Sequence, residues 1–284
     1  MRRVALLAGL VLLAGGGSIP LTAQQTATAA HRESGIEVAG EFTQGGWMRG
    51  RVPAGTTCIA LDGKVLDLAP DGSFFAAFDR DAPASAVLAA CKADATPLHR
   101  SLTITPRAWR IENINAARSP GNLPTAEFLR IREGELARIA AARAQVTGAG
   151  GWRQDFARPL QGRVSGLFGS QRIYRGFPGA YHGGMDIAAP AGTPYVAPAE
   201  GVVVLAADQP FTLEGNLLII DHGAGLSSAF LHSSRLAVRQ GDRVQKGQLL
   251  GYVGMTGRAT GPHLHWALKW RDAKLDPLLF APQP

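Results

Sequence analysis

Short runs in which apolar and polar residues alternate fill much of the chain, and this pattern predicts a mainly β protein. Between residues 35 and 105 the runs are separated by the tight-turn signals Asp62-Gly63 and Asp71-Gly72. This stretch predicts a small β-sandwich-like domain. It carries no catalytic constellation, so positioning a substrate, binding a partner and covering an active site are all open roles for it.

The period changes between Pro124 and Val146, where apolar residues recur about every 3.6 positions. Thr125 is a candidate N-cap, so the segment predicts a linking helix. We expect one apolar and one solvated face, formed respectively by Phe128, Ile131, Leu136 and Ile139 and by Arg130, Arg132, Arg138 and Arg143. The glycine-rich segment 148–151 then predicts a flexible joint.

The C-terminal half carries most of the histidines. His263 and His265 stand in an apolar strand pattern, and side chains two residues apart on a strand point the same way, about 7 Å from each other. His182 and Asp186 are four residues apart, but the two glycines between them favour a loop that leads into a short strand. The spacing is therefore not that of the helical H-E-x-x-H motif.

These residue types suit a catalytic metal centre. A catalytic zinc ion usually takes three protein ligands from His, Asp, Glu or Cys and leaves a fourth position for the water that it activates. His182, Asp186 and the pair His263 and His265 supply one side chain more than three. The sequence therefore predicts a zinc site with a further histidine beside it.

Several motifs follow one another in order between about Pro159 and Leu279: Arg163–Gly169, His182–Pro190, Pro198–Val204, Gly215–Gly223, Leu231-His232, Gly241–Gln248 and Thr260–His265. In this order they resemble the lysostaphin-like (LytM-type) zinc endopeptidases, which cut peptide bonds in bacterial peptidoglycan. The resemblance implies a C-terminal antiparallel β-sheet peptidase domain of the duplicated hybrid motif type.

Position by position, the resemblance implies that His182, Asp186 and His265 bind one zinc ion per chain. His232 and His263 would be the catalytic pair that polarises the bound water and steadies the tetrahedral intermediate. An aspartate and two imidazoles would leave the centre with a net charge near +1, which lowers the pKa of bound water towards neutrality. A hydroxide could then attack a peptide carbonyl at pH 7.

Other polar positions in these motifs have less defined roles. His222 matches a structural Asp-His-Gly turn, and Asn216 is either a turn residue or a polar group near the site. Phe230 stands where the family usually has Tyr. Tyr174 and Tyr181 are the only tyrosines shortly before the first metal ligand, at a spacing that differs from the family's, so the oxyanion-stabilising group stays unassigned.

Two other functions match parts of the sequence. Segments 198–201 and 241–248 also resemble the hammerhead strands of biotinyl and lipoyl carrier domains, but Lys246 lies between Gln245 and Gly247 rather than between methionines. The stronger alternative is a catalytically silent envelope protein of the same fold, which binds peptidoglycan and regulates other wall hydrolases. The presence of all five site residues favours the enzyme.

The first residues predict export. Arg2 and Arg3 precede an apolar run of about eleven residues, too short for a bilayer span of about 20, with a cleavage site after Ala23. We therefore expect a removable signal peptide, no membrane span after its removal, and a location in the periplasm or cell envelope. An uncleaved anchor is the alternative. Cys58 and Cys91, the only cysteines, could pair there or remain reduced.

The charge fits an anionic envelope polymer. The formal net charge is +7, and it falls to about +5 without Arg2 and Arg3. Lysines and arginines are scattered and accompany no nucleic-acid motif, so nucleic acid is not an expected partner. Peptidoglycan is the expected substrate, and the N-terminal domain could bind another envelope protein.

Together these patterns predict four parts: a signal peptide over 1–23, an N-terminal β domain over 24–106, a helical linker over 107–151 and a zinc peptidase domain over 152–284. Which peptidoglycan bond is cut depends on loop shapes that the sequence leaves open.

Overall fold

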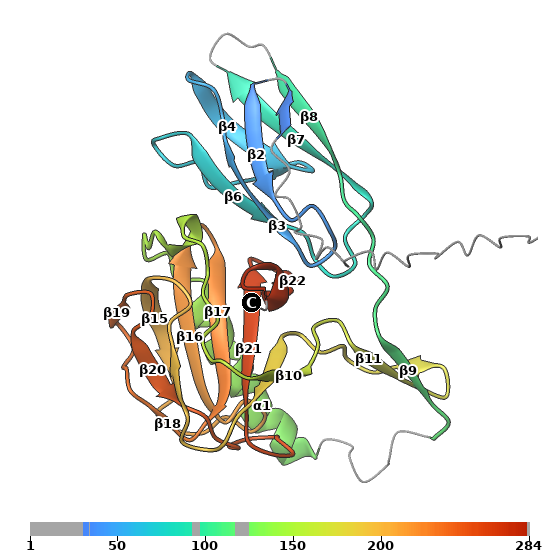
Figure 1. Ribbon diagram of the computed structural model, residues 1–284, viewed down its shortest axis with the longest axis vertical. Helices are drawn as coiled ribbons and strands as arrows, with labels where there is room; N and C mark the ends of the chain where they lie inside the picture. Colours follow the sequence, from blue (N-terminus) through green and yellow to red (C-terminus); the bar gives the residue numbers. More distant parts are fainter. Residues whose placement is uncertain (1–30, 34, 93–96, 117–124, 283–284) are drawn as a thin grey trace, which may run out of the picture.

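The computed structural model describes residues 31–33, 35–92, 97–116 and 125–282. The expected signal peptide lies outside these residues. Among the described helices, none combines the length and the apolar character that a membrane crossing requires. Most of the regular secondary structure in the described chain is antiparallel β-sheet, as the alternating pattern predicts (Figure 1).

Two four-stranded antiparallel sheets form the N-terminal part, here called the N-terminal sandwich. One sheet has the order β1 (His31–Glu33), β2 (Ile36–Gly40), β3 (Trp47–Arg51), β6 (Ser73–Ala77), and the other β5 (Lys64–Val65), β4 (Thr56–Leu61), β7 (Ser85–Lys92), β8 (Leu98–Thr103). Strand β7 alternates exposed and buried positions, as a strand with one covered face must. Met48, Ile59, Phe74 and Leu88 are fully buried in one apolar core.

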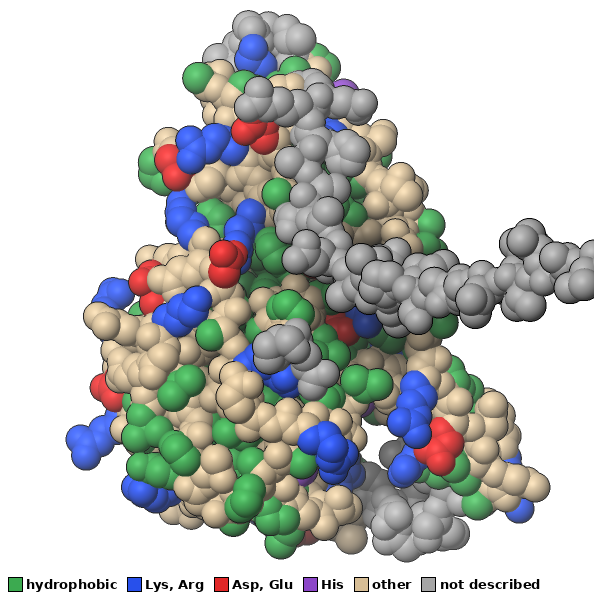
Figure 2. Space-filling model, viewed as in Figure 1, with side chains coloured by type: hydrophobic (Ala, Val, Ile, Leu, Met, Phe, Trp, Pro, Cys, Tyr) green, Lys and Arg blue, Asp and Glu red, His purple; other side chains and the backbone are tan. Residues whose placement is uncertain are grey.

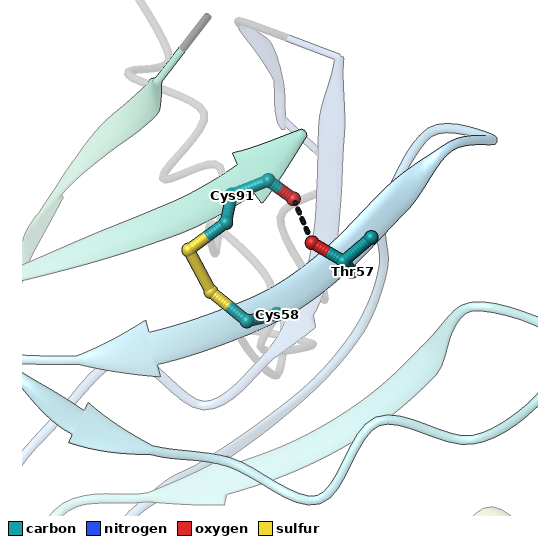
Figure 3. The surroundings of a disulfide bond; sticks show 3 residues. All are labelled: Thr57, Cys58 and Cys91. Atoms are coloured by element: carbon teal, nitrogen blue, oxygen red, sulfur yellow. Dashed lines mark hydrogen bonds between the residues drawn. A yellow bond between two sulfur atoms is a disulfide. The ribbon is translucent and has the colours of Figure 1, made fainter. Parts of the chain in front are cut away.

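A disulfide links the second of these sheets. Cys58 on β4 and Cys91 on β7 stand directly opposite each other in the strand register and are bonded, which decides the question that the sequence left open (Figure 3). Thr57 Oγ1 also donates a hydrogen bond to the carbonyl oxygen of Cys91, at 3.3 Å. Closing a loop of 33 residues stabilises the folded state by about 3 to 4 kcal/mol in the chain-entropy model.

A larger antiparallel sheet of eight strands, here called the site sheet, occupies the C-terminal half (Figure 1). Its order is β10 (Arg163–Gly166), β13 (Met185–Ala188), β21 (His263–Trp270), β17 (Leu226–Ser233), β16 (Asn216–Gly223), β15 (Gly201–Ala206), β19 (Arg243–Val244), with β22 (Ala273–Leu275) paired to the end of β21. Strand β21 alternates half-buried and buried residues, with Leu264 and Trp266 in the core. Its histidines therefore lie on the opposite face.

Two three-stranded sheets flank the site sheet. The first has the order β12 (Phe177–Pro178), β11 (Gln171–Tyr174), β9 (Ile111–Ile114), and the second β14 (Pro194–Val196), β20 (Leu249–Tyr252), β18 (Arg235–Leu236). Strand β9 runs parallel to β11 and falls within the segment for which the sequence predicted a helical linker. The linker range therefore contributes a strand as well as a helix.

The N-terminal sandwich packs against the far end of β21. Trp47 and Phe75 lie 5.3 and 6.4 Å from Phe280, measured between ring centroids, and Phe75 also meets Trp270. Trp47 Nε1 donates to the carbonyl oxygen of Leu279 at 3.0 Å. The described residues of both parts thus share one apolar core.

Helix α1 (Ala126–Arg143) packs beside β15 and β16, on the face of the site sheet opposite the large apolar core. Thr125 caps it, since its hydroxyl accepts from the Phe128 backbone N–H at 3.1 Å. Apolar residues on this face form a second small core with Ile139 and Ala142.

The expected apolar face of α1 was wrong in part. Ile131 and Leu136 are 40% and 49% exposed, whereas Glu135 and Ala142 are buried. The helix touches the sheet along a narrow strip, and a carboxylate can be buried there because neighbouring groups satisfy its hydrogen bonds. Arg132, expected on the solvated side, has a side chain only 14% exposed.

The glycine segment that follows the helix is packed, whereas the sequence predicted a flexible joint. Gly151 begins the 3-10 helix η2 (Gly151–Arg153), and a Cβ added there would lie 2.0 Å from the carbonyl oxygen of Glu200. A Cβ added to Gly223 would lie 1.9 Å from the carbonyl oxygen of Ala149. Glycine is needed at both points because two backbone segments approach each other closely. The other 3-10 helix, η3 (Pro277–Leu279), follows β22.

Candidate metal centre and groove

Strand register brings the predicted metal ligands together. On β13 and β21, Asp186 stands opposite His265, and Ala188 stands opposite His263. His182 lies in the loop before β13, where its backbone N–H donates to Ser170 at 2.8 Å. Residues that are far apart in the sequence therefore meet on one face of the site sheet.

Three ligand atoms converge at this point. His182 Nε2 and His265 Nδ1 lie 3.1 and 2.8 Å from Asp186 Oδ1, and the two nitrogens are 3.1 Å apart. Tetrahedral zinc with bonds of about 2.0 to 2.1 Å places its ligand atoms about 3.3 Å from one another. The three atoms therefore lie close to one face of such a tetrahedron. The His182 Nδ1–H donates to the carbonyl oxygen of Leu167 at 3.0 Å, which leaves the Nε2 lone pair directed at the centre.

Two further histidines stand beside this cluster. The rings of His232 and His263 are 4.9 Å apart between centroids, and His263 Nε2 lies 3.7 Å from Asp186 Oδ1. His232 Nδ1 bonds the carbonyl oxygen of Thr256, and His263 Nδ1 bonds that of Gly261, both at 2.8 Å. A carbonyl oxygen can only accept, so Nδ1 carries the proton in both neutral rings and Nε2 is left as a base.

Protonation in the cluster follows from burial and hydrogen bonding. Burial alone would raise the pKa of Asp186, but its bonds to His182 and His265 outweigh that and hold the pKa far below its usual range. Burial lowers the pKa of His265 and of His232. Burial also acts to lower the pKa of His182, yet the bond to Asp186 prevails and raises it. The cluster thus offers an anionic carboxylate, and a metal ion bound there would displace the proton that Asp186 helps His182 to hold.

Two glycines make room for the ligands. A Cβ on Gly166 would lie 2.2 Å from Asp186 Oδ2, and a Cβ on Gly184 would lie 2.6 Å from His265 Nε2. Any other residue at either position would push against the side chain of one of these candidate ligands.

The remaining polar residues singled out in the sequence support the fold around the site. His222 is fully buried and bonds the Glu200 carbonyl and Ser228 Oγ at 2.7 and 2.8 Å, and burial lowers its pKa to about 4. Asn216 Nδ2 donates to the Ser233 carbonyl at 2.9 Å, which ties β16 to the strand end that carries His232.

The aromatic residues near the site also have structural contacts, and so does Lys246 of the carrier-like segment 241–248. Phe230 stacks on buried Tyr195 in the core, at 5.4 Å between ring centroids. Tyr181 lies beneath the Arg80 guanidinium, 4.6 Å from it, and burial raises the Tyr181 pKa to about 12. Lys246 Nζ donates to a backbone carbonyl at 2.6 Å, so it is held against the surface.

Sequence reasoning missed Thr256 and Glu214. Their backbone carbonyl oxygens accept hydrogen bonds from His232, one from the ring and the other from the backbone N–H, both at 2.8 Å. Residue type gives no signal for such contacts, because every residue carries a carbonyl group.

A groove of about 2150 Å³ lies beside His182 and Asp186. The sheet of β9, β11 and β12 forms one side, and Phe128 near the start of α1 and Leu213 line other parts. Figure 2 shows the surface hollowed beside the lobe of these three strands, with Lys and Arg side chains near its edge. The lining residues that the structure describes all lie between Arg110 and Arg258, outside the N-terminal sandwich.

The part of the chain that carries these residues is similar to known proteins. Residues 180–277 match Peptidase family M23. A region of 89 residues is 44% identical to the peptidoglycan DD-endopeptidase ShyA of Vibrio cholerae, covering 31% of this chain and 20% of that protein. A region of 100 residues is 38% identical to the DD-carboxypeptidase/endopeptidase Mpg of Neisseria meningitidis, covering 35% and 23%. These matches span about a fifth of each relative.

The fold extends the similarity beyond this region. A crystal structure of a Pseudomonas aeruginosa protein assigned to peptidase M23 is 27% identical, with a TM-score of 0.63 over 84% of this chain and 94% of that one. The chain therefore contains a Peptidase family M23 domain, and the resemblance to LytM-type peptidases is confirmed. Its relatives include peptidoglycan endopeptidases.

Proposed function

We propose that this protein is an exported zinc metalloendopeptidase that hydrolyses peptide bonds, in cross-links or stem peptides, of bacterial peptidoglycan. The observation that carries the proposal is the convergence of His182 Nε2, Asp186 Oδ1 and His265 Nδ1 within 3.1 Å of one another, with two bases beside them. The names of the relatives support the choice of peptidoglycan.

The donor set fits one zinc ion per chain. Two imidazole nitrogens and one carboxylate oxygen are common ligands of catalytic zinc, and the Leu167 carbonyl fixes the His182 ring in the tautomer that presents Nε2. When bound, zinc supplies the Lewis acidity that lowers the pKa of a water molecule and polarises a peptide carbonyl.

His232 and His263 handle the protons. Each has its Nδ1–H bonded to a backbone carbonyl, so Nε2 of one ring can take a proton from the attacking water. That ring, now protonated, can give the same proton through Nε2–H to the leaving amine, while the other ring stabilises the developing oxyanion if it already carries a proton on Nε2. The groove beside His182 and Asp186 is the place where the peptide would bind.

Export is part of the proposal. Peptidoglycan lies outside the cytoplasmic membrane, and disulfides persist in oxidising compartments. The bond between Cys58 and Cys91 supports a periplasmic or envelope location. A silent regulator is not favoured, because all five site residues are present in an arrangement suited to catalysis.

Digestion of purified peptidoglycan tests the proposal. We expect the zinc-loaded protein to release fragments with new peptide termini, identified by mass, and the release to stop with a chelator or with His265→Ala. His99→Ala is the matched control, because His99 is exposed on β8 of the N-terminal sandwich, which contributes no lining residue to the groove. Identical fragments from folded His265→Ala protein would refute the proposal.

Metal content separates the two sets of histidines. Loss of bound zinc is expected for His182→Ala, Asp186→Ala and His265→Ala, but not for His232→Ala or His263→Ala. Elemental analysis of purified variants measures it. If His263→Ala loses zinc as fully as His265→Ala, then the assignment of ligands is wrong.

A further inference from the structure

The groove beside the metal centre has an excess of positive charge. Its acidic residues already have partners: Glu112 accepts from Arg172 Nε at 2.9 Å, and Asp186 is bonded to two histidines. Three other arginines line the groove, and within the described part of the chain none of them has an acidic partner: Arg110, Arg163 and Arg258. A ligand that carries carboxylates would complement this charge.

Strand register places one of these arginines close to the reacting groups. Arg163 on β10 stands opposite Ala188 on β13, and Ala188 stands opposite His263 on β21. Residues that face each other on neighbouring antiparallel strands project from the same face. Val164 packs towards the core, which leaves exposed Arg163 on the groove face. Arg163 and His263 are thus two strands apart in one row, with only a methyl group between them.

The position of Arg163 in this row sets the distance from His263 at which it could bind a charged group of the ligand. Neighbouring strands lie about 4.7 to 4.9 Å apart, so the backbones of Arg163 and His263 are separated by about 10 Å. An extended peptide advances about 3.3 Å per residue, so this distance corresponds to about three residues of substrate. A guanidinium binds a carboxylate through two parallel hydrogen bonds, a geometry that neutral amides do not match.

We propose that Arg163 anchors a substrate carboxylate within about three residues of the scissile bond, and that the substrate is a carboxylate-bearing stem peptide rather than an uncharged peptide bridge. Arg258, which also lines the groove, adds to the attraction. The inference rests on the proposed peptidase function and adds the chemical class of its substrate.

Cleavage of paired substrates tests this. Cross-linked stem peptides purified from peptidoglycan are compared with the same peptides after carbodiimide coupling to ammonia, which turns each carboxylate into an amide. We expect kcat/KM to be about 10 to 100 times higher for the acid form, mainly through a lower KM. The reason is that a hydrogen bond between charged groups is stronger than one between neutral groups. Arg163→Gln should remove most of this preference, and Arg163→Lys should keep part of it.

The matched control is Arg239→Gln, an exposed arginine that does not line the groove. Equal cleavage of acid and amide forms by the unaltered protein, or a preference that survives Arg163→Gln, overturns the assignment. Failure to cut either form would count against the peptidase itself. Calorimetric binding of both peptides to the zinc-loaded protein then still decides the role of Arg163, since carboxylate binding does not require turnover.

A second, independent observation concerns helix α1. Arg132 donates to both carboxylate oxygens of Glu214, each at 2.6 Å, and also to Glu135, whose carboxylate accepts from Thr212 Oγ1 at 2.7 Å. These side chains of α1 and of the loop before β16 are only 10 to 16% exposed. A buried charge network of this kind fixes the loop against the helix.

The same loop holds His232. The Glu214 carbonyl accepts the His232 backbone N–H at 2.8 Å, and a Cβ on Gly215 would lie 2.2 Å from Thr256, whose carbonyl holds the His232 ring. His232 has φ of 65°, a left-handed conformation that is unfavourable for a non-glycine residue. Surrounding contacts must therefore maintain it.

We infer that Arg132 is a positioning residue for His232, acting through Glu214. Arg132→Leu should lower kcat about 10- to 100-fold with KM and zinc content almost unchanged, because the base is displaced while the groove and the ligands remain. Arg132→Lys should restore part of the rate. Glu214→Gln provides a second variant if Arg132→Leu folds poorly.

Arg138→Leu is the matched control. Arg138 also joins α1 to this loop, through Asp208 at 2.7 Å, but this pair is exposed and does not reach Glu214. Equal kcat values for the folded Arg132→Leu and Arg138→Leu proteins would show that the helix contributes only stability, and would overturn the inference.

Discussion

The N-terminal sandwich and the site sheet are both built from antiparallel strands, yet they bury different side chains. Within the described residues the sandwich buries mainly apolar groups, and a disulfide joins two of its strands. The site sheet buries several polar side chains as well: Asp221, His222, Ser227, Ser228, His232 and Ser233. One region thus gains stability from apolar packing and a cross-link, whereas the other buries hydrogen-bonded polar side chains as well.

The polar side chains buried in the site sheet are tolerated because they are hydrogen-bonded. His222 has both ring nitrogens bonded, and the Tyr195 hydroxyl is paired with Ser233 Oγ at 2.8 Å. Removing one partner of such a pair leaves the other unsatisfied, at a cost of about 1 to 3 kcal/mol. Substitution of His263 on the site sheet should mainly change the reaction rate. Loss of the disulfide in the N-terminal sandwich should mainly change the free energy of unfolding.

The largest effect is expected at the face of the site sheet that carries the proposed catalytic histidines. His263→Ala should lower kcat by about 10² to 10⁴, because proton transfer by a positioned histidine contributes about that factor. The zinc content and the free energy of unfolding should change little. Steady-state kinetics together with elemental analysis measures both, and turnover near that of the unaltered protein would show that His263 has another role.

The converse change is expected in the sandwich. Cys58→Ser should lower the free energy of unfolding by about 3 to 4 kcal/mol, because the open chain gains entropy in the unfolded state. The kcat of the folded protein should remain the same at low temperature. Urea unfolding with a parallel activity assay checks this. A rate that falls together with stability would mean that the sandwich contributes to catalysis, which would weaken the comparison.

Acid should destabilise the site sheet through His222. Its folded pKa of about 4 lies below the usual 6.5, so the unfolded chain binds more protons between these values. The stability contributed by neutral His222 is complete above about pH 6.5 and is lost as the pH falls towards 4, by about 3 kcal/mol in total. Urea midpoints from pH 7 to pH 4 measure it. His222→Gln should flatten this dependence, and an equally steep loss in that variant would contradict the assignment.

The smallest effect concerns the space around the ligands. Gly166→Ala should weaken zinc binding about 10- to 100-fold, because the added Cβ displaces the Asp186 carboxylate. Competition with a chelator of known affinity measures the change. Gly134→Ala is the control, since an added Cβ on this residue of α1 meets nothing within 4 Å. Unchanged zinc affinity in Gly166→Ala would mean that the site relaxes freely.

The sequence by itself determined the mainly β class and the helix cap, and its motifs marked the histidines and the aspartate of the candidate site. These features depend on local signals: the two-residue period of a strand, a threonine before a helical pattern, and ligand-type residues in motifs of a known order. Thr125 caps α1, and His182, Asp186 and His265 do lie together.

Tertiary structure alone decided the rest. The pattern of α1 did not predict that Glu135 would be buried and Leu136 exposed, because burial depends on the partner that the helix meets. Nor does the sequence show that Arg163 shares a row with His263, since register across β10, β13 and β21 is set by long-range pairing. Residue types specify which chemistry is available, whereas the pairing of distant strands fixes which groups come close enough to use it.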